Sequence, residues 1–361
     1  MICPPGRADG YVVRLAQLGD LADFLALAQL TGPGFTSLPA DALLIARLLE
    51  NSHRAANGDE GAVFLCLEHV ASGQVVGCAA VKRGGTKRAG FANFRHTQAT
   101  ENGCGELRIV DDYAELTEIG GLFLHPDHRG GGLGALLASS RYLYLDTARH
   151  SFGERVYAEL RGAIAPDGTS PFYDAVCKPL LGISFLEADE ICATGDNQRL
   201  VDLFPSEPIN TAHFSPVAQL SIGGCHSAGQ AARALLINEG FRFDGVVDLL
   251  DGGALLVAKV TELSILDNAR TVTVQRSAAS RGPARLLLSA GSPTTFRCIS
   301  AAVDADEHRV FVSDEACDRL RMSDGNMVRI APFSPRGTPK AVRANSRTPK
   351  DQEIGDEPAN C

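Results

Sequence analysis

A turn with four glycines and one arginine carries the clearest chemical signal in this 361-residue chain. It reads HPDHRGGGLGALL and spans residues 125–137. Ordered glycine costs conformational entropy, so it is retained where the backbone needs a positive φ or where another group approaches closely. Glycine N–H groups beside a guanidinium suit a pyrophosphate, which needs donors and a positive charge. The residues that we assign to such a cradle are Arg129, Gly130, Gly132 and Gly134.

The flanks of this turn indicate how a phosphate would be held. Upstream, ELTEIGGLFLHP (residues 115–126) predicts a strand with a bulge or widening at Gly120 and Gly121. Downstream, LGALLASSRYLYLDTARH (residues 133–150) has apolar residues at helical spacing. The turn would then open a helix, whose first N–H groups and dipole attract anions. The alternative is an ordinary loop between a strand and a helix.

The composition of the whole chain is that of a soluble globular protein, with 45% hydrophobic and 21% charged residues. A net charge of −9 argues against broad binding of nucleic acid or of an anionic membrane. The first ten residues, MICPPGRADG, lack a signal-peptide pattern, and no apolar run reaches spanning length. The ten cysteines show no C-x-x-C pair, so we expect reduced thiols, no metal site and a cytoplasmic location.

The order of predicted elements indicates an α/β protein with a mixed sheet. A strand and two helices come first, followed by a hairpin through Gly73, further strands, the glycine turn with its helix, and a strand at 155–162. In such a sheet the ligand lies at the open ends of the central strands. We expect a main domain over residues 1–260, a small β-barrel over 261–333 and a disordered tail over 334–361.

Several strings resemble a known family. A strand followed by Arg-x-x-Gly-x-Gly is similar to the acyl-CoA motif of the GCN5-related N-acetyltransferase superfamily, and the later segments SPFYDAVCKPLLGISF and ARALLINEGF each resemble its later helix. More closely, TGPGFTSLPAD (31–41), YAELRGAIAPDGTSPFY (157–173) and ARALLINEGFRF with VVDLLDGGALL resemble the arginine N-succinyltransferase family over residues 11–333. The resemblance implies a GCN5-related acyltransferase fold with a large insertion and the small C-terminal barrel.

The resemblance also assigns two residues. The family's proton-donor histidine falls on His226, and its succinyl-CoA contact falls on Leu122. The sequence departs from the family twice: the usual Val-His-Pro is Cys225-His226-Ser227, and a Cys-Thr pair before Leu122 is Gly120-Gly121. A histidine also fits the chemistry, because its ordinary pKa lets it give or take a proton near neutral pH.

Three other polar residues are candidates for the site. Tyr173 is an alternative acid, since related acyltransferases place a tyrosine on the corresponding helix; an aromatic core residue is the competing interpretation. Glu118 and Glu159 lie on strands beside the predicted ligand and are candidates for binding the substrate amine, with solvated strand carboxylates as the alternative. The acidic residues Glu187, Asp189 and Glu190 would attract a guanidinium or simply be solvated.

The function that the resemblance implies is succinyl transfer from succinyl-CoA to the α-amine of L-arginine in arginine catabolism. Succinyl-CoA is then a co-substrate, and no permanently bound cofactor is expected. Two alternatives remain: transfer of succinyl or another acyl group to ornithine or another basic amino acid, and a non-catalytic CoA-binding subunit. A homo- or hetero-oligomer is expected, because some bacteria carry two paralogous subunits.

Overall fold

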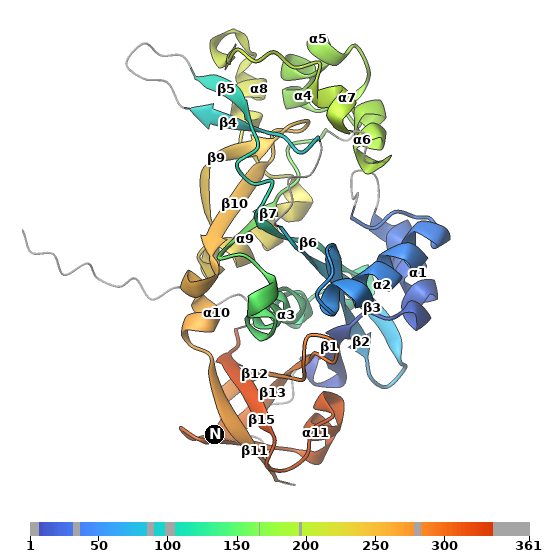
Figure 1. Ribbon diagram of the computed structural model, residues 1–361, viewed down its shortest axis with the longest axis vertical. Coiled ribbons are helices and arrows are strands. Elements are labelled where there is room, and N and C mark those ends of the chain that lie inside the picture. The colour runs from blue at the N-terminus through green and yellow to red at the C-terminus, as the bar shows by residue number, and fades with distance from the viewer. Residues whose placement is uncertain are drawn as a thin grey trace, which may run out of the picture.

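The computed structural model describes residues 7–31, 37–84, 90–97, 105–165, 167–194, 197–277, 282 and 284–334 (Figure 1). The predicted tail, apart from Ser334, lies outside these residues. In the described part of the chain, 15 strands form one continuous hydrogen-bonded sheet flanked by helices. The mixed α/β class predicted from the sequence is therefore confirmed. None of the described helices is both long and apolar enough to cross a membrane.

The middle of the sheet carries the predicted hairpin and the strand that precedes the glycine turn. Its strands follow the order β1-β2-β3-β6-β7. Every neighbouring pair here is antiparallel except β6 and β7, which run parallel. The hairpin turns at Gly73, whose φ of 70° favours glycine. These strands span Tyr11–Leu15 (β1), Ala62–His69 (β2), Gln74–Lys82 (β3), Thr117–Leu124 (β6) and Arg155–Glu159 (β7).

Helices cover both faces of this part of the sheet. Helices α1 (Leu21–Thr31) and α2 (Ala42–Ala56) pack against Phe64 and neighbouring side chains on one face, and helix α3 packs against Leu65 and its neighbours on the other. Alternate residues of β2 thus face opposite helix layers, which explains why the strand is apolar throughout.

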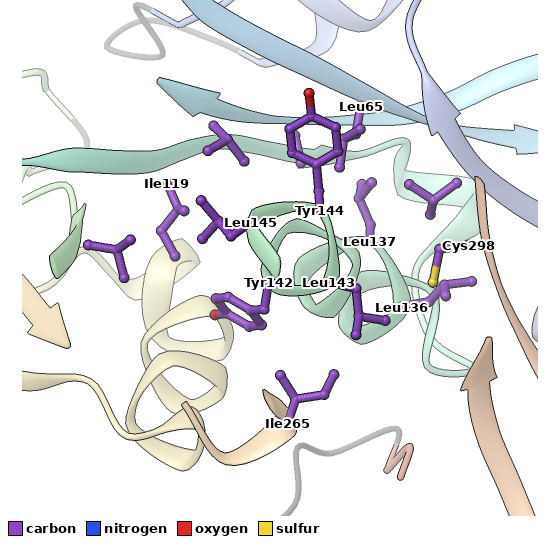
Figure 2. Close-up of a cluster of buried hydrophobic side chains, with 14 of the residues drawn as sticks. Leu65, Ile119, Leu136, Leu137, Tyr142, Leu143, Tyr144, Leu145, Ile265 and Cys298 are labelled. Atoms are coloured by element: carbon purple, nitrogen blue, oxygen red, sulfur yellow. The ribbon is translucent and has the colours of Figure 1, made fainter. Parts of the chain in front are cut away.

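Helix α3 (Leu133–Thr147) is buried on nearly every side (Figure 2). Leu65 and Ile119 approach it from the sheet, while Ile265 and Cys298 approach it from later elements of the chain. A helix that is apolar around its whole circumference is one buried on all sides, which accounts for the LGALLASSRYLYL sequence. The helix that follows the glycine turn is therefore rigidly held.

A large insertion extends the sheet beyond β7. Its strands β10, β9, β4, β5 and β8 continue the sheet in that order, and short helices gather near them (upper part of Figure 1). Phe94, Phe172 and Phe204 form part of its core. The strands span Asn93–Thr97 (β4), Glu106–Val110 (β5), Ile209–Asn210 (β8), Arg242–Asp248 (β9) and Ala254–Lys259 (β10). These helices span Pro171–Val176 (α4), Lys178–Leu181 (α5), Phe185–Thr194 (α6), Asn197–Val201 (α7) and Pro216–Ser221 (α8). Helix α9 (Gln230–Glu239) lies lower in Figure 1, and its Leu236 belongs to the core around α3.

The last five strands form the predicted small barrel. They follow the order β12-β15-β11-β14-β13, and a further pairing of β12 with β13 closes the ring. Strand β13 also pairs with β1, which joins the barrel to the middle of the sheet. The strands span Arg270–Arg276 (β11), Ala284–Ala290 (β12), Arg297–Ala305 (β13), Arg309–Val312 (β14) and Met327–Pro332 (β15), with α10 (Ser264–Asp267) before them and α11 (Asp314–Leu320) among them.

Candidate active site

The parallel strands β6 and β7 separate after a short ladder. Only two residue pairs join them in the described structure, Thr117 with Val156 and Glu118 with Tyr157. Beyond this point β6 continues to Leu124 along β3, while β7 continues along β10. The backbone groups that face one another between the diverging ends are thus released from the sheet at the carboxyl ends of two parallel strands. This is where α/β proteins place their ligands.

A β-bulge interrupts β6 at the start of this divergence. Cys78 pairs with Phe123 and Ala80 pairs with Gly120, so the single residue between them on β3 faces both Gly121 and Leu122. Gly121 has a φ of 57°, the left-handed conformation expected at the first position of a glycine bulge. The bulge predicted at Gly120 and Gly121 is confirmed. It rotates Leu122, the predicted acyl-CoA contact, out of the regular ladder.

The glycine turn adopts the conformation that its composition requires. Gly130, Gly131 and Gly132 have φ values of 89°, 61° and 85°, and Gly132 is the N-cap of α3 without any side-chain cap. Gly134 differs, because a Cβ placed there would meet no atom within 4 Å and no positive φ is recorded for it. The fold itself therefore does not require glycine at 134. The role of Gly134 in a phosphate cradle therefore stays a prediction, with an ordinary loop as the alternative.

Arg129 stands beside the turn and is exposed. Its Nε donates to the Leu124 carbonyl oxygen at 3.3 Å, and its guanidinium lies 5.9 Å from the centre of the Phe123 ring. These contacts hold the side chain against the end of β6, just before α3 begins. The Arg129 guanidinium and the N-terminus of α3 thus lie within one connection of about five residues. A pyrophosphate site needs a positive charge beside helix N–H groups in this way.

His226 lies at the end of β7, across the divergence from β6. Its backbone N–H donates to the Arg161 carbonyl oxygen at 2.7 Å. If the β6–β7 register were continued, Arg161 would stand opposite Leu122. The His226 Nδ1 accepts the Ala228 N–H at 3.2 Å and caps a short 3₁₀ helix, so the cap is the histidine itself and Ser227 is the first residue of that helix. With Nδ1 accepting, the neutral ring carries its proton on Nε2.

Tyr173 lies elsewhere, within the core of the insertion. Its side chain is fully buried against Phe185, and its hydroxyl lies 3.1 Å from the Ile183 carbonyl oxygen and 3.2 Å from that of Ser184. Burial raises the pKa of the phenol. This placement favours the aromatic-core interpretation over a catalytic acid.

Two glutamates lie on the face of the sheet that Tyr157 occupies. The Glu118 carboxylate forms an ion pair with Lys82 at 2.6 Å and accepts the Tyr157 hydroxyl at 3.2 Å. Glu159, two residues beyond Tyr157, is exposed to solvent. Burial by the surrounding protein nevertheless raises its pKa well above the ordinary value, reinforced by the charge of Asp248. Glu159 is therefore a solvent-accessible carboxyl whose protonated form the surrounding protein favours.

The sequence did not single out the acidic residues that complete this region. Asp251 accepts the N–H groups of Gly162 at 2.7 Å and of Gly253 at 2.8 Å, which fastens the end of β7 to the start of β10. Burial and the neighbouring Asp248 raise the pKa of Asp251 despite these two bonds. The available signal was the DGG string around Asp251, where a Cβ on Gly253 would lie 1.9 Å from the Leu160 carbonyl oxygen.

The structure therefore brings most of the predicted residues to one end of two strands. Leu122 and the glycine cradle stand on the β6 side, and His226 and Glu159 stand on the β7 side. Glu118 lies at the last rung that joins the strands. Tyr173 is apart. The described residues contain no group of three or more histidine, cysteine, aspartate or glutamate side chains arranged to bind a metal ion.

Two parallel strands that diverge at a bulge, followed by a glycine turn into a helix, define the GCN5-related N-acyltransferase class. Comparison with known proteins identifies the family within it. The sequence-family model described as arginine N-succinyltransferase beta subunit matches residues 11–265. The family model of that subunit's C-terminal domain matches residues 270–332. The chain belongs to the arginine N-succinyltransferase family, which confirms the prediction from its sequence.

The relatives cover nearly the whole chain. An arginine N-succinyltransferase from Enterobacter sp. (strain 638) is 32% identical over 90% of this chain and 98% of its own length. One from Escherichia coli (strain 55989 / EAEC) is 31% identical over 88% of this chain and 96% of its own. Among solved structures, the arginine/ornithine succinyltransferase subunit AI from Pseudomonas aeruginosa is 26% identical with a TM-score of 0.79, over 89% of this chain and 98% of that one.

Proposed function

We propose that this chain catalyses the transfer of succinyl from succinyl-CoA to the α-amine of L-arginine. The observation that carries the proposal is the arrangement at the carboxyl ends of β6 and β7. Glu159 ends β7 and His226 bonds to the chain just beyond it, while β6 carries the bulge that includes Leu122. An acyl donor held on the β6 side would meet an amine held on the β7 side. We further propose that the protein works in the cytoplasm, within arginine catabolism, as a homo- or hetero-oligomer.

The β6 side binds the acyl donor. The N–H groups of the glycine turn and the Arg129 guanidinium hold the CoA pyrophosphate at the start of α3. The chain at Leu122 supplies a backbone N–H to the thioester carbonyl oxygen, where negative charge develops as the amine attacks. Because α3 is packed on all sides, the phosphate contacts and the bulge keep a fixed separation. This arrangement positions the reacting carbon without any covalent enzyme intermediate.

The β7 side binds the amine. Glu159 has no hydrogen bond or ion pair with any described residue and is exposed, so it is available to a cationic substrate, whereas Glu118 already holds Lys82 and Tyr157. We assign Glu159 the contact with the substrate cation. Glu118 keeps the two strands in register at the last rung and supplies negative charge beside the site.

We assign His226 to the departing thiolate of CoA. The amine nitrogen bonds to the thioester carbon, the carbon–sulfur bond breaks, and the departing thiolate needs a proton. The Nε2–H of His226 is the atom free to donate to the departing sulfur, because Nδ1 is occupied by the Ala228 N–H. The proton that the attacking nitrogen loses reaches that sulfur through water in the same step, so the imidazole stabilises the developing thiolate through its Nε2–H and stays neutral. A histidine in this role contributes about 10²–10⁴-fold to the rate.

A thiol-release assay tests the proposal. The purified protein is incubated with succinyl-CoA and arginine, ornithine or no amine, and free CoA thiol is followed. We expect rapid release with arginine and little without an amine. Preferred release with ornithine would reassign the acceptor. No release with either amine, together with retained CoA binding, would favour a non-catalytic subunit and overturn the proposal.

A further inference from the structure

Arg161 is a cation just beyond the end of β7 that has no role in the proposed transfer of the acyl group. It lies two residues beyond Glu159, the last residue of β7. Its carbonyl oxygen accepts the His226 N–H at 2.7 Å, and the next residue, Gly162, donates to Asp251. The backbone of Arg161 is thus fixed between the proposed proton donor and a buried carboxylate.

The guanidinium of Arg161 is not neutralised by the protein around it. Its Nε is buried without a hydrogen-bond partner, and the side chain forms no ion pair with any described residue. The charge of Arg161 also acts on Asp189 of α6. Burial raises the pKa of Asp189, and the attraction of Arg161 opposes this rise only in part. A buried guanidinium nitrogen without an acceptor is costly in the unliganded protein, because it loses hydration and gains nothing in return.

Several other arginines of the described structure have a partner; Arg83 and Arg319 also have an unpartnered Nε, but another nitrogen of each guanidinium donates to a carbonyl oxygen. Arg14 binds Asp20 and Glu68, Arg285 binds Asp9, and the buried Arg141 donates to a carbonyl of its own helix. Arg161 stands among acids without joining any of them at ion-pair distance. Its planar guanidinium is therefore available to a ligand. A carboxylate matches this group, because its two oxygens can accept two parallel N–H hydrogen bonds.

We propose that Arg161 binds a substrate carboxylate next to the reacting carbonyl and so selects for substrates that carry one. This inference rests on the proposed function, which supplies two such groups. The terminal carboxylate of the succinyl chain lies two methylenes from the thioester carbon, and the α-carboxylate of the amino acid lies one carbon from the attacking nitrogen. Either one would bind to the guanidinium just beyond the end of β7, beside the backbone that anchors His226.

The experiment compares each substrate with an analogue that lacks its carboxylate. Butyryl-CoA replaces the succinyl carboxylate by a methyl group, and agmatine is arginine without its α-carboxylate. The kcat/KM values for both pairs, and the dissociation constants by calorimetry, are measured for the wild type, Arg161→Gln and Arg161→Lys. The control is Arg155→Gln, at the opposite end of β7, whose side chain lies 4.0 Å from Asp244 at the exposed surface. Thermal unfolding of each variant checks the fold.

We expect Arg161→Gln to lower kcat/KM about 10- to 100-fold for the substrate whose carboxylate it binds and to leave the matching analogue nearly unchanged. Arg161→Lys should recover part of the loss, since it keeps the charge without the planar guanidinium. A reduced preference for succinyl-CoA over butyryl-CoA identifies the acyl carboxylate, and a reduced preference for arginine over agmatine identifies the other. If neither preference changes, Arg161 only offsets the acids around it and the proposal is wrong.

The binding measurements separate this inference from the proposed function. A wild type that releases no thiol refutes the proposed turnover. The dissociation constants of succinyl-CoA against butyryl-CoA, and of arginine against agmatine, still decide whether Arg161 recognises a carboxylate. Conversely, full wild-type turnover with unchanged preferences in Arg161→Gln would refute the role of Arg161 alone.

Discussion

The C-terminal barrel and the β6–β7 region use the same hydrogen-bonding groups in opposite ways. In the barrel, the pairing of β12 with β13 closes the ring, and the interior is filled by residues such as Val272, Leu288, Ile299 and Val310. Between β6 and β7, the ladder ends after two pairs, and glycines, Glu159 and Arg161 stand among the apolar residues beyond it.

This difference shows what an interrupted ladder provides. A closed ring satisfies its own backbone groups and leaves its interior side chains only the task of packing. Where two parallel strands part, N–H and carbonyl groups are available to a substrate, and polar side chains are reached by solvent. Stability should therefore be concentrated in the barrel and chemistry at the divergence, and each of the following substitutions tests one side of this contrast.

Substituting His226 should have the largest effect. We expect His226→Gln to lower kcat by about 10²–10⁴-fold while acyl-CoA binding persists, because the phosphate contacts lie across the divergence. The control is His125→Gln, because His125 caps a short 3₁₀ helix in the same way, with Nδ1 accepting the Asp127 N–H. Steady-state kinetics and thermal unfolding separate catalysis from stability. A kcat above about a tenth of the wild-type value would remove His226 as the proton donor.

A cavity in the barrel should act on stability alone. Ile299 is fully buried in the barrel core, so Ile299→Ala should cost about 2–5 kcal/mol of unfolding free energy. Denaturant unfolding measures this loss. The kcat and both KM values of the folded fraction should be unchanged, since β13 contributes nothing to the divergence. A selective rise in either KM would show that the two regions are coupled.

Substitutions in the cradle should weaken acyl-CoA binding and leave the turnover rate nearly unchanged. Arg129→Ala removes a charged phosphate contact worth about 1.5–3 kcal/mol, and Gly132→Val forces a β-branched residue into a φ of 85°. Both should raise the KM for acyl-CoA far more than the KM for arginine. Arg149→Ala, near the other end of α3, is the matched control. An unchanged acyl-CoA KM in both cradle variants would mean that the glycines only form a turn.

Glu159 should give the smallest effect, and one that depends on pH. Because its pKa is raised in the fold, its protonated form is favoured there, so stability should fall as pH rises from about its ordinary value of 4.5 through its folded pKa. Glu159→Gln should remove this loss, giving a higher Tm than the wild type at neutral pH and an equal one near pH 4. It should also raise the KM for arginine roughly tenfold. A parallel pH dependence of Tm in both proteins would contradict the assignment.

The sequence predicted well what local patterns determine. The hairpin, the bulge at Gly120 and Gly121, the strand before the glycine turn and the helix after it all follow from composition over short windows. Four of the barrel strands were also predicted. The strand β13 was missed. Its sequence, RCISAAVDA, contains mostly small apolar residues and shows no clear alternation of polar and apolar positions.

What depends on distant pairing was not predicted. Nothing local reveals that the chain at His226 lies against Arg161, or that Asp251 holds Gly162, because these contacts join segments more than sixty residues apart. The raised pKa of Glu159 likewise needs Asp248 and Asp251 in place. Tyr173 shows the converse: an aromatic residue in the first turn of a helix capped by Ser170 has the same local sequence whether it faces a substrate or a core.

The pairing of β1 with β13 has a consequence for how the chain folds. Arg14 on the first strand pairs with Arg297 on a strand that is synthesised nearly three hundred residues later, and Arg285 reaches back to Asp9. One edge of β1 therefore stays unpaired on the ribosome until almost all of the polypeptide has emerged. Open edges template intermolecular pairing, and contacts this remote in sequence form slowly. The nascent chain is thus most prone to aggregate just before its last strands appear, and truncation within the barrel would make that exposed state permanent.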